Sequence, residues 1–172
     1  MDDIDFHGAA PVPDRRSFLK LGLAAGTALA AGGGMLAFVG RDAEADRGTV
    51  LAAVVPAVLG DALPSTRAQA VARTVHAVET AIAGLAPAAQ AELAQLFMLL
   101  ASAPGRTLLA GVGSPWAQAS TDEVGAFLAR WRHHRLAMLR SGYQALHDLV
   151  AGAWYAMPEA WGPIGYPGPP RV

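Results

Sequence analysis

The sequence has no cysteine among its 172 residues, and Lys20 is its single lysine. Without cysteine, the chain cannot form a disulfide framework, a thiolate metal site or a lipid-modified anchor. The absence of Cys-x-x-Cys-His also excludes covalent attachment of a c-type haem. No Gly-x-Gly-x-x-Gly follows a candidate strand, and no phosphate loop or Gly-x-Ser-x-Gly elbow is present. The chain therefore lacks the motifs that usually bind a cofactor or build a nucleophilic active site.

An excess of charge of one sign is also missing, since the net charge is −1. Residues 1–45 carry four basic and six acidic side chains (4 − 6 = −2), and residues 46–172 carry nine arginines and eight acids (9 − 8 = +1). A nearly neutral domain has no long-range attraction for nucleic acid.

A charged segment, DRRSFLK at 14–20, stands directly before an apolar run rich in glycine and alanine. A basic segment followed by such a run is typical of a secretory signal, and paired arginines specify the twin-arginine route, which carries folded proteins. Asp14 occupies a position where Ser or Thr is usual. The predicted export signal consists of Arg15, Arg16, Phe18, Leu19 and Lys20.

The apolar run at 21–39 is nearly long enough to span a bilayer, which takes about 20 residues. Ala43 and Ala45 form a small-x-small cleavage site around Glu44. Two interpretations follow: cleavage after Ala45, or retention of 1–45 as an N-terminal anchor. We favour cleavage because glycine clusters make a poor permanent helix. The expected location is the periplasm.

The remainder predicts an all-α fold, a small helical bundle at 46–157 followed by an extended tail at 158–172. We expect a short helix over 49–59 that is kinked or ended near Pro56, because proline disrupts a helix interior. Apolar residues at helical spacing, with capping residues at the ends, predict further helices at 65–83, 87–102 and 121–157. We expect a bend near Gly142 in the last of these helices and a helical turn at 106–111. Ser120 and Glu123 form a potential capping box.

For two helical faces, the sequence does not decide whether they pack within this chain or against another protein. The helix at 87–102 is apolar on most sides, so it is either central to the core, which we favour, or shared with a partner. Arginines and histidines surround Trp131 on the last helix. They either pair with carboxylates at the edge of the core or, as we expect for Arg135 and Arg140, face an acidic patch on another subunit.

The tail combines aromatic residues with prolines and glycines, a composition that forms neither a helix nor a regular strand. It is too aromatic for a solvated tail, so we expect an extended strap on a surface. That surface belongs either to its own domain or, as we favour, to a partner protein, with Trp161 and Tyr166 as contacts.

These pieces resemble the gluconate 2-dehydrogenase subunit 3 family, the small (gamma) subunits of exported flavin dehydrogenases of the glucose-methanol-choline oxidoreductase class. The resemblance covers roughly 50–172 and the type of leader, with the tail as its specific part. The matching tail residues are Trp154, Tyr155, Pro158, Trp161, Gly165, Tyr166, Pro167, Gly168, Pro169 and Pro170. Less distinctive matches are Arg106, Trp116, Trp131, Arg140 and Leu146.

The resemblance implies a non-catalytic subunit that escorts a folded, FAD-loaded sugar or alcohol dehydrogenase through the export translocase and stabilises it. FAD would reside in the catalytic subunit, and electrons often pass from it to a haem c subunit. The partner interface would include the tail matches together with Trp131, Arg135 and Arg140.

Two alternatives remain open. One is a stand-alone periplasmic metal-binding module that uses His133, His134, His147 and Asp148, although adjacent helical histidines diverge by about 100° and converge poorly on one ion. The other is a structural protein tethered to the membrane by an uncleaved leader.

Overall fold

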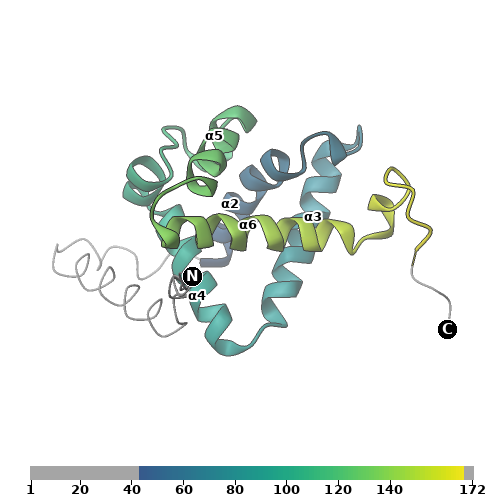
Figure 1. The fold of residues 1–172 in the computed structure, drawn as a ribbon, viewed down its shortest axis with the longest axis horizontal. Helices are drawn as coiled ribbons and strands as arrows, with labels where there is room; N and C mark the ends of the chain where they lie inside the picture. Colours follow the sequence, from purple (N-terminus) through teal and green to yellow (C-terminus); the bar gives the residue numbers. More distant parts are fainter. Residues whose placement is uncertain (1–42, 169–172) are drawn as a thin grey trace, which may run out of the picture. The chain divides into compact units, whose positions relative to one another are not determined.

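The computed structural model describes residues 43–168, with side chains from residue 46 onward, and this part belongs to one compact unit. It contains helices and turns and no strand (Figure 1), so the all-α prediction is confirmed for these residues. The elements are α2 (Ala43–Leu59), η2 (Gly60–Ala62), α3 (Arg67–Ala83), α4 (Pro87–Ala101), η3 (Gly105–Leu109), η4 (Trp116–Gln118), α5 (Thr121–Arg132), α6 (Ala137–Tyr155) and η5 (Pro158–Ala160). The export signal at 14–20, the apolar run at 21–39, Pro169 and Pro170 lie outside the described residues.

Helix α2 is the centre of the bundle and packs against α3, α4, α5 and α6. Its buried side chains recur at helical spacing, so one continuous face supplies much of the core; they are Val50, Leu51, Val54, Val55 and Leu59. The predicted end at Leu59 is confirmed, whereas α2 begins at Ala43, before the predicted start at residue 49, and does not end at Pro56.

The packing of α2 explains why Pro56 is tolerated inside it. Proline removes one backbone hydrogen bond, that to the carbonyl of Ala52, at a cost of about 3 kcal/mol. Ala52 is exposed, so solvent can reach this part of the helix. Val54 and Val55 are fully buried beside Pro56, and burying each contributes about 1.5–3 kcal/mol. The core contacts therefore outweigh the loss.

Helix α3 presents the predicted apolar face to the core, with Val78 and Ile82 buried. The core face also includes Thr74, whose hydroxyl donates to the carbonyl oxygen of Ala70 at 2.8 Å and is thereby satisfied. The carboxylate oxygens of Glu79 on α3 lie 2.8 and 2.9 Å from Nε of Arg47 on α2.

Helix α4 lies at the edge of the bundle. Phe97 and Leu100 are its buried residues, Leu93 and Leu96 are half-buried, and Met98 is 55% exposed. The interpretation of α4 as the central helix is therefore wrong, since α2 holds that position. Because α4 is apolar on most sides but lies at the edge, apolar surface on its outer side remains exposed.

The predicted long helix at 121–157 is two helices, α5 and α6, separated at His133–Leu136. Side chains satisfy the backbone at this break: Nδ1 of His134 accepts the N–H of Leu136 at 3.0 Å. The guanidinium of Arg140 donates to the carbonyls of His134 and Arg135 at 2.7 and 3.0 Å. These bonds replace the helical ones that an uninterrupted chain would make.

Gly142 lies within α6 and not at a bend. A Cβ atom there would lie 2.6 Å from Cζ3 of Trp131. The glycine is therefore needed for close approach of α5 and α6, and the bend predicted at this position is wrong.

Candidate partner interface

The C-terminal hook, residues 156–168, folds back on the end of α6 and is not the extended strap that we predicted. Pro158 opens the turn η5, and Ala160 is 3% exposed. The indole N–H of Trp161 donates to the carbonyl oxygen of Tyr155 at 2.9 Å. The N–H of Tyr166 donates to the carbonyl oxygen of Trp161 at 3.0 Å. Proline and glycine here produce turns, and backbone bonds hold them.

Two glycines and one ring pair shape the hook. Trp161 and Tyr166 meet edge to face with centroids 5.5 Å apart. Gly165 and Gly168 have φ of +70° and +96°, which other residues rarely adopt. A Cβ atom on Gly168 would lie 3.0 Å from the ring of Trp161. An ion pair of 2.8 Å between Arg73 on α3 and Glu159 joins the hook to the bundle.

The hook and Tyr155, the last residue of α6, carry apolar side chains that the described part of the chain leaves exposed. Tyr155 is 44% exposed, Ile164 58% and Tyr166 46%. Prolines 158, 163 and 167 lie beside them and are exposed as well. Scattered single apolar residues are ordinary on a surface, whereas exposed aromatic side chains held in one folded segment are typical of a binding surface.

The other predicted interface residues fall into two groups, buried tryptophans and exposed arginines. Trp131 and Trp154 are each 2% exposed and belong to the core, so neither offers a surface to a partner. The indole N–H of Trp131 donates to the carbonyl oxygen of Leu109 at 3.0 Å. Its ring meets Phe127 edge to face at 4.8 Å. Arg135 and Arg140 are exposed.

Arg135 and Arg140 belong to a larger basic region, which we call the arginine surface: Arg130, Arg132, Arg135 and Arg140. Residues 46–168 contain eight arginines and eight acids (8 − 8 = 0), yet residues 124–147 contain these four arginines and no acid. The prediction of carboxylate partners at the core edge is wrong for the described residues, in which none of the four forms an ion pair. The guanidinium of Arg130 instead donates to the carbonyl of Ala110.

The connection between α5 and α6, around which the arginine surface lies in the sequence, and the hook are at opposite ends of α6 (Figure 1). At 1.5 Å per residue, the helix places its two ends about 28 Å apart. Exposed Leu136, at 52%, accompanies the arginine end. The chain thus has two different candidate contact regions, one aromatic and neutral and one basic.

A polar support of the loop before α5 was missed from the sequence. The guanidinium of Arg106 donates to the carbonyl oxygens of Val112 and Gly113 at 3.0 and 2.5 Å, and also to that of Ser114. Glu123 accepts the N–H groups of Gly113 and Ser114 at 2.6 and 3.2 Å. The sequence did contain a signal for this support, since an arginine, glycines and a glutamate in the first turn of α5 all lie within residues 106–123.

Glu123 has a lowered pKa because the backbone N–H of Ser114 stabilises its charged form, and that of Gly113 and the charge of Arg106 act in the same direction. Half of the predicted capping box is confirmed: the hydroxyl of Ser120 accepts the N–H of Glu123 at 3.1 Å. The Glu123 carboxylate supports the 112–114 loop and does not complete the box.

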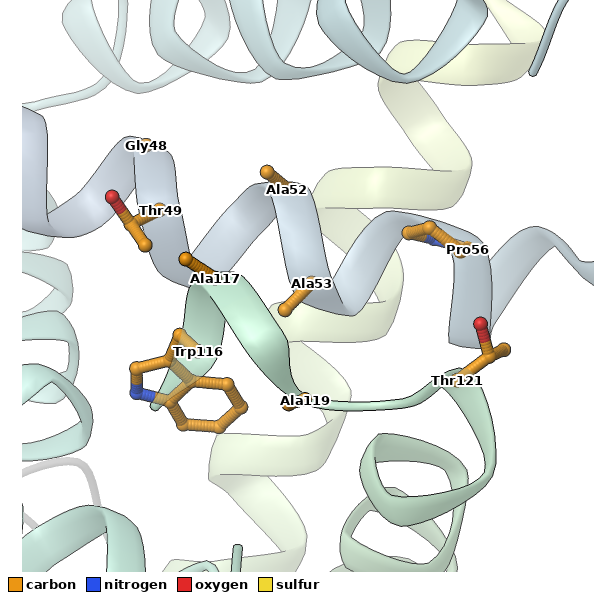
Figure 2. A pocket seen from close by; sticks show the side chains of 9 residues that line it. All are labelled: Gly48, Thr49, Ala52, Ala53, Pro56, Trp116, Ala117, Ala119 and Thr121. Atoms are coloured by element: carbon orange, nitrogen blue, oxygen red, sulfur yellow. The ribbon is translucent and has the colours of Figure 1, made fainter. Parts of the chain in front are cut away.

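A hollow of about 530 Å³ lies between α2, η4 and the start of α5 (Figure 2). Small side chains line it, with Trp116 on one side. The indole N–H of Trp116 is already bonded to the carbonyl of Leu100 at 2.8 Å. This hollow holds no ionisable side chain, so it offers shape without acid–base or ligating chemistry.

The histidines of the metal-binding alternative do not all converge. His133 and His147 line one hollow, whereas Nδ1 of His134 is engaged by the N–H of Leu136. Nδ1 of His147 lies 3.1 Å from an oxygen of Asp148. Among residues 43–168, no group of three or more His, Asp or Glu side chains is placed to hold a metal ion.

Ala43 and Ala45, the predicted cleavage residues, lie in the first turn of α2. Within the described part of the chain, no single helix has the length and apolar composition to cross a membrane, and only α2 and α3 together, bent by 118°, pass that test.

Comparison with known protein families, with characterised proteins and with solved structures finds no match for this chain.

Proposed function

We propose that the chain is a non-catalytic small subunit that escorts an FAD-dependent sugar or alcohol dehydrogenase through the twin-arginine route to the periplasm and stabilises it there. The dehydrogenase carries the FAD, and a haem c subunit is the candidate acceptor of its electrons. This chain supplies the export signal and a binding surface.

The observation that carries the proposal is the hook. It is the segment with the most specific resemblance to the gluconate 2-dehydrogenase subunit 3 family, and it leaves Tyr155, Ile164 and Tyr166 exposed. A preformed surface binds with less loss of conformational entropy than a segment that orders on contact. The arginine surface supports the same proposal, since its four arginines form no ion pair within the described residues and their positive charge complements an acidic protein surface.

The signal supports the proposal through a different argument. The twin-arginine route transports folded proteins, which is most useful when a cofactor is inserted in the cytoplasm. The sequence has none of the cofactor motifs considered above. The need for folded export is therefore explained by a cofactor on another subunit.

Point variants test the hook more cleanly than a deletion. Removing 158–172 would also remove buried Ala160 and the Arg73–Glu159 pair, whereas Ile164 and Tyr155 are exposed. We expect the double variant Ile164→Ser and Tyr155→Ser to melt within a few degrees of the wild type and to lose most of the co-purified flavoprotein. Leu85→Ser, an exposed leucine in the α3–α4 turn, is the matched control. Equal recovery of flavoprotein with both proteins would remove the hook from the interface.

Changing Arg15 and Arg16 to lysine tests the shared signal. We expect both this chain and its flavoprotein to accumulate in the cytoplasm, because the second protein depends on the first for export. A flavoprotein that still reaches the periplasm would contradict the escort role while leaving binding intact.

A further inference from the structure

A smaller hollow, about 330 Å³, lies between α2, α5 and α6 beside the arginine surface. Its apolar lining includes Val58 from α2 and Leu128 from α5, and Leu128 is 5% exposed. Its polar lining consists of Arg132, His133, Tyr143 and His147. A concave apolar site with a few converging polar groups is the usual form of a ligand site, and this volume lies at the small end of the range.

Gly125 lies in the wall of this hollow. A Cβ atom built on Gly125 meets no atom within 4 Å, in contrast to the tight contact at Gly142. Glycine in a helix interior is destabilising relative to alanine. A larger side chain at this position has room to extend into the hollow.

The charges around the hollow favour an anion. Arg132 is exposed and makes no ion pair within the described residues. Asp148, which follows the lining residue His147, contacts Nδ1 of His147 at 3.1 Å with its side chain 71% exposed. The partial negative charge at the C-terminus of α5 opposes an anion, but it amounts to about half a charge, whereas Arg132 carries a full one.

We propose that this hollow is a binding site for a carboxylate attached to a short apolar chain. The planar guanidinium of Arg132 matches a carboxylate with two parallel hydrogen bonds. The hydroxyl of Tyr143 and one ring N–H of His133 offer further donors, and the rings of Tyr143 and His147 lie together with centroids 5.6 Å apart. The apolar part of the ligand contacts Val58 and Leu128.

Hexanoate is a suitable probe because it joins a carboxylate to a short apolar chain, and hexanol is its uncharged counterpart. In an NMR titration of the purified full-length chain, we expect saturable shifts around Gly125, Arg132 and Tyr143 with hexanoate and much weaker ones with hexanol. Arg132→Gln should weaken hexanoate binding about tenfold, the value of one lost charge-assisted bond.

Matched variants separate binding from folding. Gly125→Leu fills the hollow and should abolish the saturable shifts without lowering the melting temperature. Gly152→Leu, where a Cβ also meets nothing within 4 Å, and Arg135→Gln, an exposed arginine outside the hollow, should bind as the wild type does. Shifts that never saturate, or that are unchanged in Arg132→Gln and Gly125→Leu, would overturn the proposal.

Such a carboxylate comes either from a free short-chain acid or from an acidic side chain of a bound protein. Saturating hexanoate should release a co-purified partner whose acidic side chain occupies the hollow, and should leave the partner bound if the ligand is a free acid. The NMR titration needs no partner, so failure of this inference and failure of the proposed escort function are separate results.

Discussion

Trp131 and Trp161 occupy opposite kinds of site, although each lies against a glycine. Trp131 is 2% exposed, and its ring fills the space above Gly142 between α5 and α6. Trp161 is half-buried in the hook, where its ring lies against Gly168 and Tyr166. The first indole bonds across the bundle to Leu109, and the second bonds six residues back to Tyr155.

The difference teaches that one type of pair serves two purposes. In the core, the glycine permits two helices to approach closely, and the tryptophan ring fills the space between them. In the hook, the glycine permits a turn and the tryptophan gives a short segment its own shape. The core pair stabilises the bundle, and the hook pair preserves a surface with Tyr155, Ile164 and Tyr166 outward.

The largest expected effect separates the two tryptophans directly. Trp131→Ala should lower the free energy of unfolding by about 3–5 kcal/mol, because it leaves a large cavity in the core. Trp161→Ala should cost about 1 kcal/mol, since the ring is only half-buried. Urea denaturation followed by circular dichroism measures both, and losses of similar size would break the distinction.

The next effect concerns the glycines on α5 and α6. Gly142→Ala should destabilise the chain by about 1–3 kcal/mol, because its new Cβ would overlap Trp131. Gly125→Ala should stabilise it by about 0.5–1 kcal/mol, because the new methyl group meets open space and favours the helix. Thermal melts of the two variants should move in opposite directions. Parallel shifts would show that the α5–α6 contact is looser than described.

Acid should act on the bundle through Glu123, whose pKa lies below its usual value of 4.5 because the N–H of Ser114, that of Gly113 and the charge of Arg106 favour the ionised form. A lowered folded-state pKa stabilises the chain above the unfolded pKa, and this contribution is lost as the pH falls through the folded pKa. Glu123→Gln should therefore be less stable than the wild type near neutral pH and should show a shallower loss of stability below about pH 4.5. Identical pH profiles would remove Glu123 from the acid response.

The smallest effect is expected where the hook meets α3. Arg73→Gln breaks the pair with Glu159, but both side chains are at least one-third exposed, so the cost should be about 0.2–1 kcal/mol. Co-purification of the flavoprotein should be nearly unchanged, since Trp161 still shapes the hook. A loss of co-purification as large as that of the Ile164 and Tyr155 double variant would mean that the ion pair, and not the ring pair, positions the interface.

The sequence predicted α3 and α4 well because local signals bound them: Gly84 follows the first, and Pro87 opens the second. It allowed an end of α2 near Pro56 because the effect of proline on a helix is judged locally, whereas the buried valines beside Pro56 act through tertiary contacts. The break between α5 and α6 is stabilised by hydrogen bonds between the backbone and the side chains of His134 and Arg140. Hydrophobic periodicity does not report such polar contacts, so the sequence predicted one continuous helix.

The candidate interface was predictable in its composition and not in its exposure. Tyr155, Tyr166, Trp131 and Trp154 are equally aromatic in the sequence, yet the bundle covers the last two and leaves the first two open. The local excess of positive charge was visible in the sequence, because residues 124–147 contain four arginines and no acid. The hollow beside these arginines was not predictable, because it depends on how three helices pack together.

Recovery of a flavin with the tagged full-length chain tests the escort role most directly. The measurement is the visible absorbance spectrum of the material that co-purifies from cytoplasmic and periplasmic fractions, with the Ile164 and Tyr155 double variant beside the wild type. We predict a flavoprotein with flavin absorbance in both wild-type fractions and a strong loss with the variant. A colourless single chain from both wild-type fractions would contradict the account.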